Sequence, residues 1–185
     1  MRIIAGRFRG TALAGLGAGD PAAHLRPTSD RVRESLFNLL AHGPYPPIEG
    51  ARVLDLFAGT GALGLEALSR GAASVTFVDK GAAALDLLKR NVARLRVEAE
   101  TAILARDATR PGANPGAPAD LAFLDPPYGK GLGERAMAAI RGQGWLAPGA
   151  LVIWEESAPL GCSPGLTLLD ARRYGDTMIS ILSAP

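Results

Sequence analysis

The chain has 185 residues, 48% hydrophobic and 21% charged, which is typical of one globular domain with a full core. One cysteine and two histidines cannot build a disulfide framework or a Cys/His zinc site, and no apolar run reaches the roughly 18 residues of a membrane span, so we expect a cytoplasmic protein without a metal or membrane partner. The net charge is +2, yet residues 1–33 hold six arginines against two aspartates, and this excess favours a polyanionic partner such as nucleic acid.

The N-terminal part of the chain predicts an arm, a loop and a helix. Residues 1–13 alternate loosely between apolar and other side chains, which suits a short hairpin or arm outside the main sheet. Residues 14–24 are rich in glycine, alanine and proline and are expected to form a loop. A helix should follow, capped by Thr28 or Ser29 and ending at about Ala41, with an apolar stripe that leaves Arg31, Arg33, Glu34 and Asn38 on other faces.

The next segment, RVLDLFAGTGALGLEALSR over residues 52–70, organises the rest of the chain. Residues 53–57 form an apolar run typical of a buried strand, glycines break the run, and the leucine spacing that follows indicates a helix that Gly71 ends. A glycine turn between a strand and a helix lets backbone amides approach a ligand closely, and their partial positive charge favours an anionic group.

Two ligands compete for this turn. Gly59, Gly61 and Gly64 spell G-x-G-x-x-G, and Asp79 follows about 20 residues on, which matches the dinucleotide fingerprint and keeps an NAD-dependent oxidoreductase as an alternative. Asp55, however, would place a like charge beside a pyrophosphate. S-adenosylmethionine fits better, because its carboxylate suits the turn amides and its ammonium and sulfonium suit Asp55.

Strand and helix patterns alternate after the turn, which predicts a parallel sheet. The last two strands are joined by Tyr174-Gly175-Asp176, a connection short enough only for an antiparallel hairpin. We expect an α/β, Rossmann-like domain over residues 25–185 with a seven-stranded, mostly parallel sheet, preceded by an arm and loop over residues 1–24. Besides the first strand, the expected strands are 74–78, 101–105, 121–124, 151–154, 166–173 and 177–182, and the expected helices are 82–96 and 132–141.

Four aspartates stand at the ends of predicted strands: Asp55, Asp79, Asp107 and Asp125. The carboxyl ends of parallel strands meet at one edge of the sheet, where ligands of open α/β sheets bind. We therefore interpret the acids as acceptors for one extended ligand. Asp55 would face its methionine part, Asp79 its ribose hydroxyls and Asp107 its adenine amine.

The tetrapeptide Asp125-Pro126-Pro127-Tyr128 directly follows a predicted strand. Two prolines remove backbone donors, so the turn presents acceptors that can hold both N–H groups of an exocyclic amine. Tyr128 offers a ring on which an unpaired base can stack. The amine nitrogen would then attack the methyl group in line, with Asp125 orienting the amine and stabilising the positive charge that develops on it.

These segments resemble the class I S-adenosylmethionine methyltransferases with a DPPY motif, and more narrowly the bacterial guanine-N2 methyltransferases of small-subunit (16S) ribosomal RNA. The resemblance rests on RIIAGRFRG (residues 2–10), LRPTSDRVRESLFNLL (25–40), LDLFAGTGALGLEALSRGA (54–72), LDPPY (124–128) and RYGDT (173–177).

The resemblance implies a partner, ribosomal RNA or a small-subunit assembly particle, and three sets of site residues. The base and the reaction would be served by Asp125, Pro126, Pro127 and Tyr128. The cofactor would be held by Asp55, Phe57, Ala58, Gly59, Thr60, Gly61, Asp79, Lys80, Asp107 and Ala108. RNA would be gripped by Arg2, Arg7, Arg9, Arg26 and Arg31, within an arm and a 26–33 segment that contact RNA.

Three alternatives stay open at this point. An adenine-N6 methyltransferase on DNA or RNA would use the same tetrapeptide, since it serves any exocyclic amine. The fingerprint leaves the oxidoreductase open, and the basic N-terminal part alone would suit a non-catalytic RNA-binding module.

Overall fold

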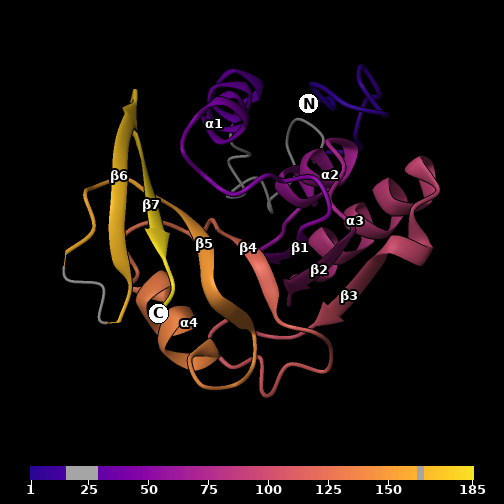
Figure 1. Ribbon diagram of the computed structural model, residues 1–185. Helices are drawn as coiled ribbons and strands as arrows, with labels where there is room; N and C mark the ends of the chain where they lie inside the picture. Colours follow the sequence, from indigo (N-terminus) through magenta and orange to yellow (C-terminus); the bar gives the residue numbers. More distant parts are fainter. Residues whose placement is uncertain (16–28, 162–164) are drawn as a thin grey trace.

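The computed structural model describes residues 1–15, 29–161 and 165–185, which form a sheet of order β3-β2-β1-β4-β5-β7-β6 flanked by helices (Figure 1). The first five strands run parallel, and β7 is antiparallel to both β5 and β6, so the predicted α/β Rossmann-like fold is confirmed. The strands are β1 (Arg52–Leu56), β2 (Ser74–Asp79), β3 (Thr101–Ala105), β4 (Ala119–Leu124), β5 (Leu146–Glu156), β6 (Thr167–Tyr174) and β7 (Thr177–Ser183); the helices are α1 (Asp30–His42), α2 (Ala62–Ser69), α3 (Ala82–Leu95) and α4 (Leu132–Ile140). Among the described residues, no helix is both long and apolar enough to cross a membrane.

The central strands are buried on both faces: successive side chains point to opposite sides of the sheet, and each side carries a hydrophobic core. Val53, Phe77 and Phe123 belong to the core that α1, α2 and α3 cover. Leu54 and Leu124 belong to the core on the other face, which α4 covers. Asp55 is the one polar residue in the buried part of β1, Val53 to Leu56.

Strand β5 is longer than its sequence predicts. The sequence predicts 151–154, whereas the strand begins at Leu146 and pairs there with Ala119 of β4. The register between β4 and β5 shifts between Ala119 and Leu121, which accommodates the irregular stretch.

Helix α1 confirms the predicted cap but corrects the predicted position of one arginine. The Ser29 Oγ accepts the Val32 N–H at 3.3 Å. Arg33, expected on another face than the apolar stripe, is fully buried. It lies three and four residues before Leu36 and Phe37, and such spacings place side chains on one helix face. Its guanidinium donates to the Arg2 carbonyl and to Asp30, so it does not face RNA.

The N-terminal arm packs against the domain rather than extending from it. A single antiparallel bridge joins Arg2 to Ala12, in agreement with the predicted hairpin outside the sheet. Ile3 and Leu13 are buried in the same core as α1 and α2. The predicted division at residues 24 and 25, and the RNA-binding candidate Arg26, lie outside the described residues.

Candidate active site

A cavity of about 490 Å³ lies at the carboxyl ends of β1, β2 and β4, next to the point where strand order reverses between β1 and β4. Its walls contain the four predicted aspartates, the DPPY tetrapeptide and nine of the ten predicted cofactor residues. The exception is Gly61, which is buried behind the wall. The structure thus brings the glycine turn and the DPPY turn, far apart in the sequence, to one cavity.

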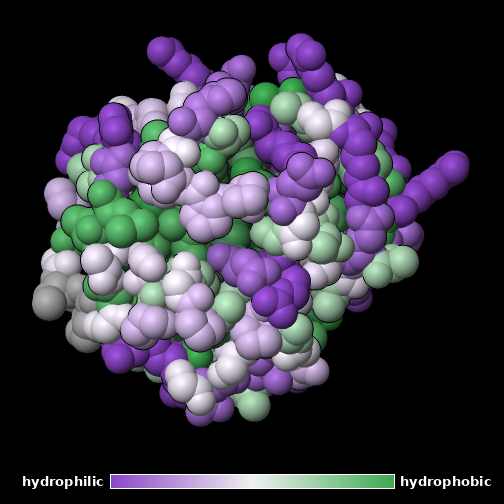
Figure 2. Space-filling view, viewed as in Figure 1, coloured by the Kyte–Doolittle hydropathy of each residue, from purple (hydrophilic) through white to green (hydrophobic). Residues whose placement is uncertain are grey.

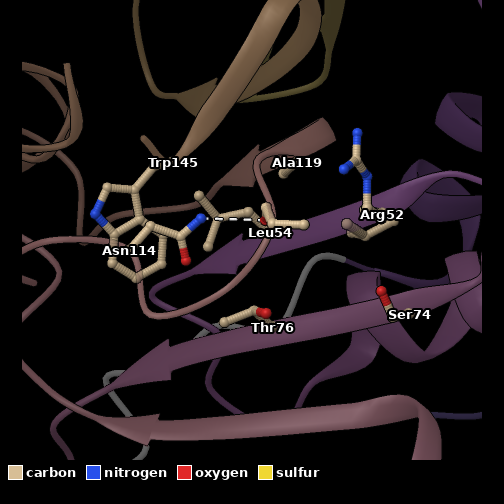
Figure 3. A pocket seen from close by; sticks show the side chains of 9 residues that line it. Arg52, Leu54, Ser74, Thr76, Asn114, Ala119 and Trp145 are labelled. Atoms are coloured by element: carbon tan, nitrogen blue, oxygen red, sulfur yellow. Dashed lines mark hydrogen bonds between the residues drawn. The ribbon is translucent and has the colours of Figure 1, made fainter. Parts of the chain in front are cut away.

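A second cavity, of about 90 Å³, lies at the opposite end of the strands (Figure 3). Arg52, Ser74 and Ala119 from the starts of β1, β2 and β4 line it, together with Asn114 and Trp145. Liquid water occupies about 30 Å³ per molecule, so this space suits a few waters rather than a cofactor. The larger cavity is therefore the candidate active site.

The glycine turn is shaped by backbone conformations that side chains disfavour. Gly59 and Gly61 have φ of +56° and +80°, and a Cβ on Gly61 would overlap Leu88 of α3. Phe57 also has φ of +60°, which is strained for a bulky residue. Because such strain persists where the surroundings enforce it, the turn is held in a defined shape at the cavity wall.

Asp55 caps helix α2 from the neighbouring strand. Its Oδ2 accepts the N–H of Gly64, in the first turn of α2, at 2.9 Å. A Cβ on Gly64 would lie only 2.5 Å from Phe77 and 2.7 Å from Val75, so glycine permits this close approach. Burial raises the pKa of Asp55 to about 8, the Gly64 hydrogen bond opposes that rise, and nearby Asp79 adds to it.

Asp79 braces the turn through both carboxylate oxygens. Its Oδ2 accepts the Gly59 N–H at 2.8 Å, and its Oδ1 accepts the Gly81 N–H at 2.8 Å. A carboxylate oxygen has more than one lone pair, so these bonds leave acceptor capacity for a ligand.

Asp107 lies at the rim of the cavity, where Lys80 Nζ donates to its Oδ2 at 2.7 Å. Thr109 donates to its Oδ1 from the backbone N–H at 2.8 Å and from the hydroxyl at 2.7 Å. These donors, Lys80 first, hold the pKa of Asp107 well below its usual range, so the carboxylate is ionised.

The DPPY turn is held from the end of β5. The Tyr128 hydroxyl donates to Glu155 Oε1 at 2.5 Å and lies 3.4 Å from Thr177 Oγ1. Burial, followed by the Glu155 hydrogen bond, keeps the pKa of Tyr128 well above its usual value, so the hydroxyl stays a donor. The Tyr128 side chain lines the cavity with 37% of the residue exposed.

Sequence reasoning missed several residues of this site. Glu155 is buried and supports Tyr128, and the two glutamates that end an apolar strand are the signal that could have found it. Lys130 also lines the cavity, and a cation two residues after the tetrapeptide was a visible signal. Leu132, at the start of α4, gave no signal beyond helical periodicity.

The predicted RNA-binding arginines in the described residues are exposed: Arg2, Arg7, Arg9 and Arg31. Arg7 is ion-paired with Glu100, and its guanidinium stacks 4.5 Å above the Phe8 ring. Figure 2 shows hydrophilic side chains gathered over the arm and α3, at the upper right, and an apolar band over β6 and β7 at the left.

Comparison with known proteins matches most of the chain. The profile of the family described as "Conserved hypothetical protein 95" covers residues 1–183. "Ribosomal RNA small subunit methyltransferase D" of Escherichia coli (strain K12) is 41% identical over 161 residues, 87% of this chain and 77% of that protein. The protein of that name from Haemophilus influenzae is 38% identical over 182 residues, 95% of this chain and 89% of that protein. A solved structure from Escherichia coli has a TM-score of 0.83 at 36% identity, covering 100% of this chain and 97% of that one.

Proposed function

The chain belongs to the Conserved hypothetical protein 95 family, and from this membership we infer that it is an S-adenosylmethionine-dependent methyltransferase of ribosomal RNA. We propose that it transfers the methyl group to the exocyclic N2 amine of a guanine in small-subunit RNA. One observation carries the proposal: the glycine turn and the DPPY turn line the same cavity, so a donor on one can reach an amine on the other.

The cavity fits S-adenosylmethionine on features of its own walls. Its volume of about 490 Å³ lies within the usual range for ligand sites. Gly59, which has no side chain, lines the cavity just before α2, and the N-terminus of a helix favours a carboxylate. The buried Asp55 gains a partner when a cation enters. A pyrophosphate at the same place would give Asp55 no cationic partner and would repel its ionised form, which disfavours NAD.

We assign the remaining cofactor contacts by position along the cavity. Asp79, at the end of β2, retains acceptor capacity for ribose hydroxyls. Asp107, ionised at the rim beside Ala108, would accept from the adenine amine, with Lys80 fixing its carboxylate. Phe57 and Ala58 would supply apolar contacts between these polar groups.

The DPPY turn would hold the base and its amine. Neither Pro126 nor Pro127 carries a backbone N–H, so the turn offers the amine acceptors rather than competing donors. The Tyr128 ring, fixed through its hydroxyl by Glu155, would stack on the base. Lys130, exposed at the wall, would contact a backbone phosphate of the RNA.

In the reaction, the bound sulfonium supplies an electrophilic methyl group. The chain's residues would align the acceptor nitrogen with that methyl group, so that an N–C bond could form as the C–S bond breaks. The Asp125 carboxylate orients the amine and stabilises the positive charge that develops on nitrogen. The extra proton leaves the nitrogen after transfer, so a strong base is not required.

The arm and the start of α1 would provide the RNA grip. Arg2, Arg9 and Arg31 are exposed, and arginine pairs well with phosphate through its planar fork. The arm also reaches the cavity, since the Thr60 hydroxyl, on the cavity wall, donates to the Met1 sulfur at 3.9 Å.

The test is methylation of small-subunit RNA and particles purified from cells that lack this gene, using S-adenosylmethionine with a labelled methyl group. We expect N2-methylguanine after digestion to nucleosides, and we expect Asp125→Ala to abolish labelling while RNA binding persists. Label in N6-methyladenine would overturn the guanine assignment. Calorimetry with both cofactors is the second arm, because tight NAD binding without S-adenosylmethionine binding would overturn the whole proposal.

A further inference from the structure

The N-terminal arm is fastened to the helix that starts at the glycine turn. Glu66 of α2 is fully buried, and its two carboxylate oxygens accept the Ile4 N–H at 2.8 Å and the Ala5 N–H at 3.1 Å. One turn later, Ser69 Oγ donates to the Ala5 carbonyl at 2.6 Å and accepts the Phe8 N–H at 3.0 Å. The first half of the arm is thus tied to α2 through buried polar groups.

The second half of the arm is tied to the glycine turn itself, through Asn91 of α3. Asn91 is fully buried, and its Oδ1 accepts the Ala14 N–H at 2.7 Å. Its Nδ2 donates to the Ala14 carbonyl at 3.1 Å and to the Thr60 carbonyl at 2.9 Å. One side-chain amide therefore uses both N–H donors and its oxygen to join the arm to the turn.

Thr60 lies between Gly59 and Gly61, so its carbonyl orientation is linked to that of the amides beside it. Peptide units are planar, and anchoring the Thr60 carbonyl fixes the adjoining Gly61 N–H, which bonds the Ala58 carbonyl at 2.7 Å. Neither glycine restricts its own backbone. The Asn91 amide is thus an external restraint on the most permissive part of the cavity wall.

We propose that Asn91 is a positioning residue for the cofactor turn, and that through it the N-terminal arm completes the S-adenosylmethionine site besides gripping RNA. This inference rests on the proposed function for the identity of the ligand. It predicts that loosening the arm at Asn91 weakens cofactor binding even when no RNA is present.

The test compares variants that loosen the arm at two different places. Asn91→Asp keeps the shape and an acceptor for Ala14 but sets a carboxylate oxygen against two carbonyls; Asn91→Ser removes the contacts without adding charge. Ser69→Ala is the matched control, because it removes two of the hydrogen bonds between the arm and α2 and leaves Thr60 untouched. Calorimetry with S-adenosylmethionine, without RNA and well below each thermal midpoint, should give a Kd about five- to tenfold higher for the Asn91 variants and within about twofold of wild type for Ser69→Ala.

A second readout does not use the cofactor. Hydrogen exchange of the Gly61 amide in the free protein should be faster in both Asn91 variants than in wild type and unchanged in Ser69→Ala. Unchanged Kd and unchanged Gly61 exchange in Asn91→Ser would overturn the inference, as would equal weakening by Ser69→Ala. If wild-type protein fails to bind S-adenosylmethionine, the proposed function fails, and the Gly61 exchange still decides whether Asn91 positions the turn.

Discussion

Asp55 combines a buried position with a task that requires charge. Burial raises its pKa to about 8, so at pH 7 the carboxyl of the free protein is mostly protonated. A cationic ligand favours the ionised form and lowers that pKa. Below pH 8, binding of such a ligand must therefore release a proton, and affinity must rise as pH rises towards 8.

We predict that the Kd for S-adenosylmethionine falls between pH 6 and pH 7.5, approaching about tenfold per pH unit. The ligand's own α-ammonium titrates near pH 7.7 to 8.0, so it is charged at pH 6 and still mostly charged at pH 7.5, and its partial deprotonation flattens the upper end of the slope. Calorimetry in buffers of different ionisation enthalpy measures the proton release directly. Asp55→Asn should bind more weakly and lose the pH slope; a slope that survives in Asp55→Asn would show that another group titrates.

The hydroxyl of Tyr128 matters because it fixes a ring that we propose stacks on a base. Tyr128→Phe keeps the ring and loses the 2.5 Å bond to Glu155, so we predict a fall in kcat of about tenfold, on the scale of one or two hydrogen bonds to a charged group. Glu155→Gln keeps an acceptor and should retain more activity than Glu155→Leu. Single-turnover methylation measures the rates, and cofactor Kd serves as the control, which should be unchanged in all three variants.

At the scale of elements, the position of α2 depends on Gly64, a glycine whose φ is not positive. Gly64 lies against Phe77 and Val75 of β2, and its N–H reaches Asp55 because no side chain intervenes. Gly64→Ala should therefore push the start of α2 away from the sheet. We predict a loss of about 1 to 3 kcal/mol in the free energy of unfolding, as for other overpacked cores.

Chemical denaturation measures that loss, and Gly116→Ala is the matched control. Gly116 does not need a left-handed backbone, and the nearest atom to an added Cβ there lies 3.8 Å away. Its free energy of unfolding should change by less than about 0.5 kcal/mol, as is usual for surface sites. Equal effects of the two substitutions would refute the packing argument for Gly64.

The elements that could be predicted from the sequence are those whose signals are local. Glycine spacing and the aspartates after strands located the turn and the edge of the sheet at which the cavity lies. Helical spacing alone would have placed Arg33 on the apolar face, but its partners in the arm and in α2 could not be predicted. Asn91 likewise acts on residues far away in the chain, and helical periodicity gives no sign of such contacts.

At the scale of the whole molecule, the arm both carries exposed arginines and packs against the domain. Half of the six arginines among residues 1–33 are exposed on the arm, at positions 2, 7 and 9, while Arg33 is buried. The arm packs on α2 and reaches the cavity wall at Thr60. We therefore expect this basic surface, which runs from the cavity wall at Thr60 to the end of α2 at Ser69, to hold RNA while one base enters the cavity.

This arrangement predicts how RNA affinity depends on salt. Each phosphate contact with single-stranded RNA releases counterions, with a slope in log K against log salt of about −0.7. Replacing Arg2, Arg9 and Arg31 together by alanine should therefore weaken RNA binding and flatten the slope by about 2, if each meets one phosphate. A control variant removes the same charge at Arg90, Arg135 and Arg172, on α3, α4 and β6, which are also exposed. Filter binding from 50 to 200 mM salt measures both variants. If the control flattens the slope as much as the arm variant, attraction is a property of net charge and the arm has no special part in binding RNA.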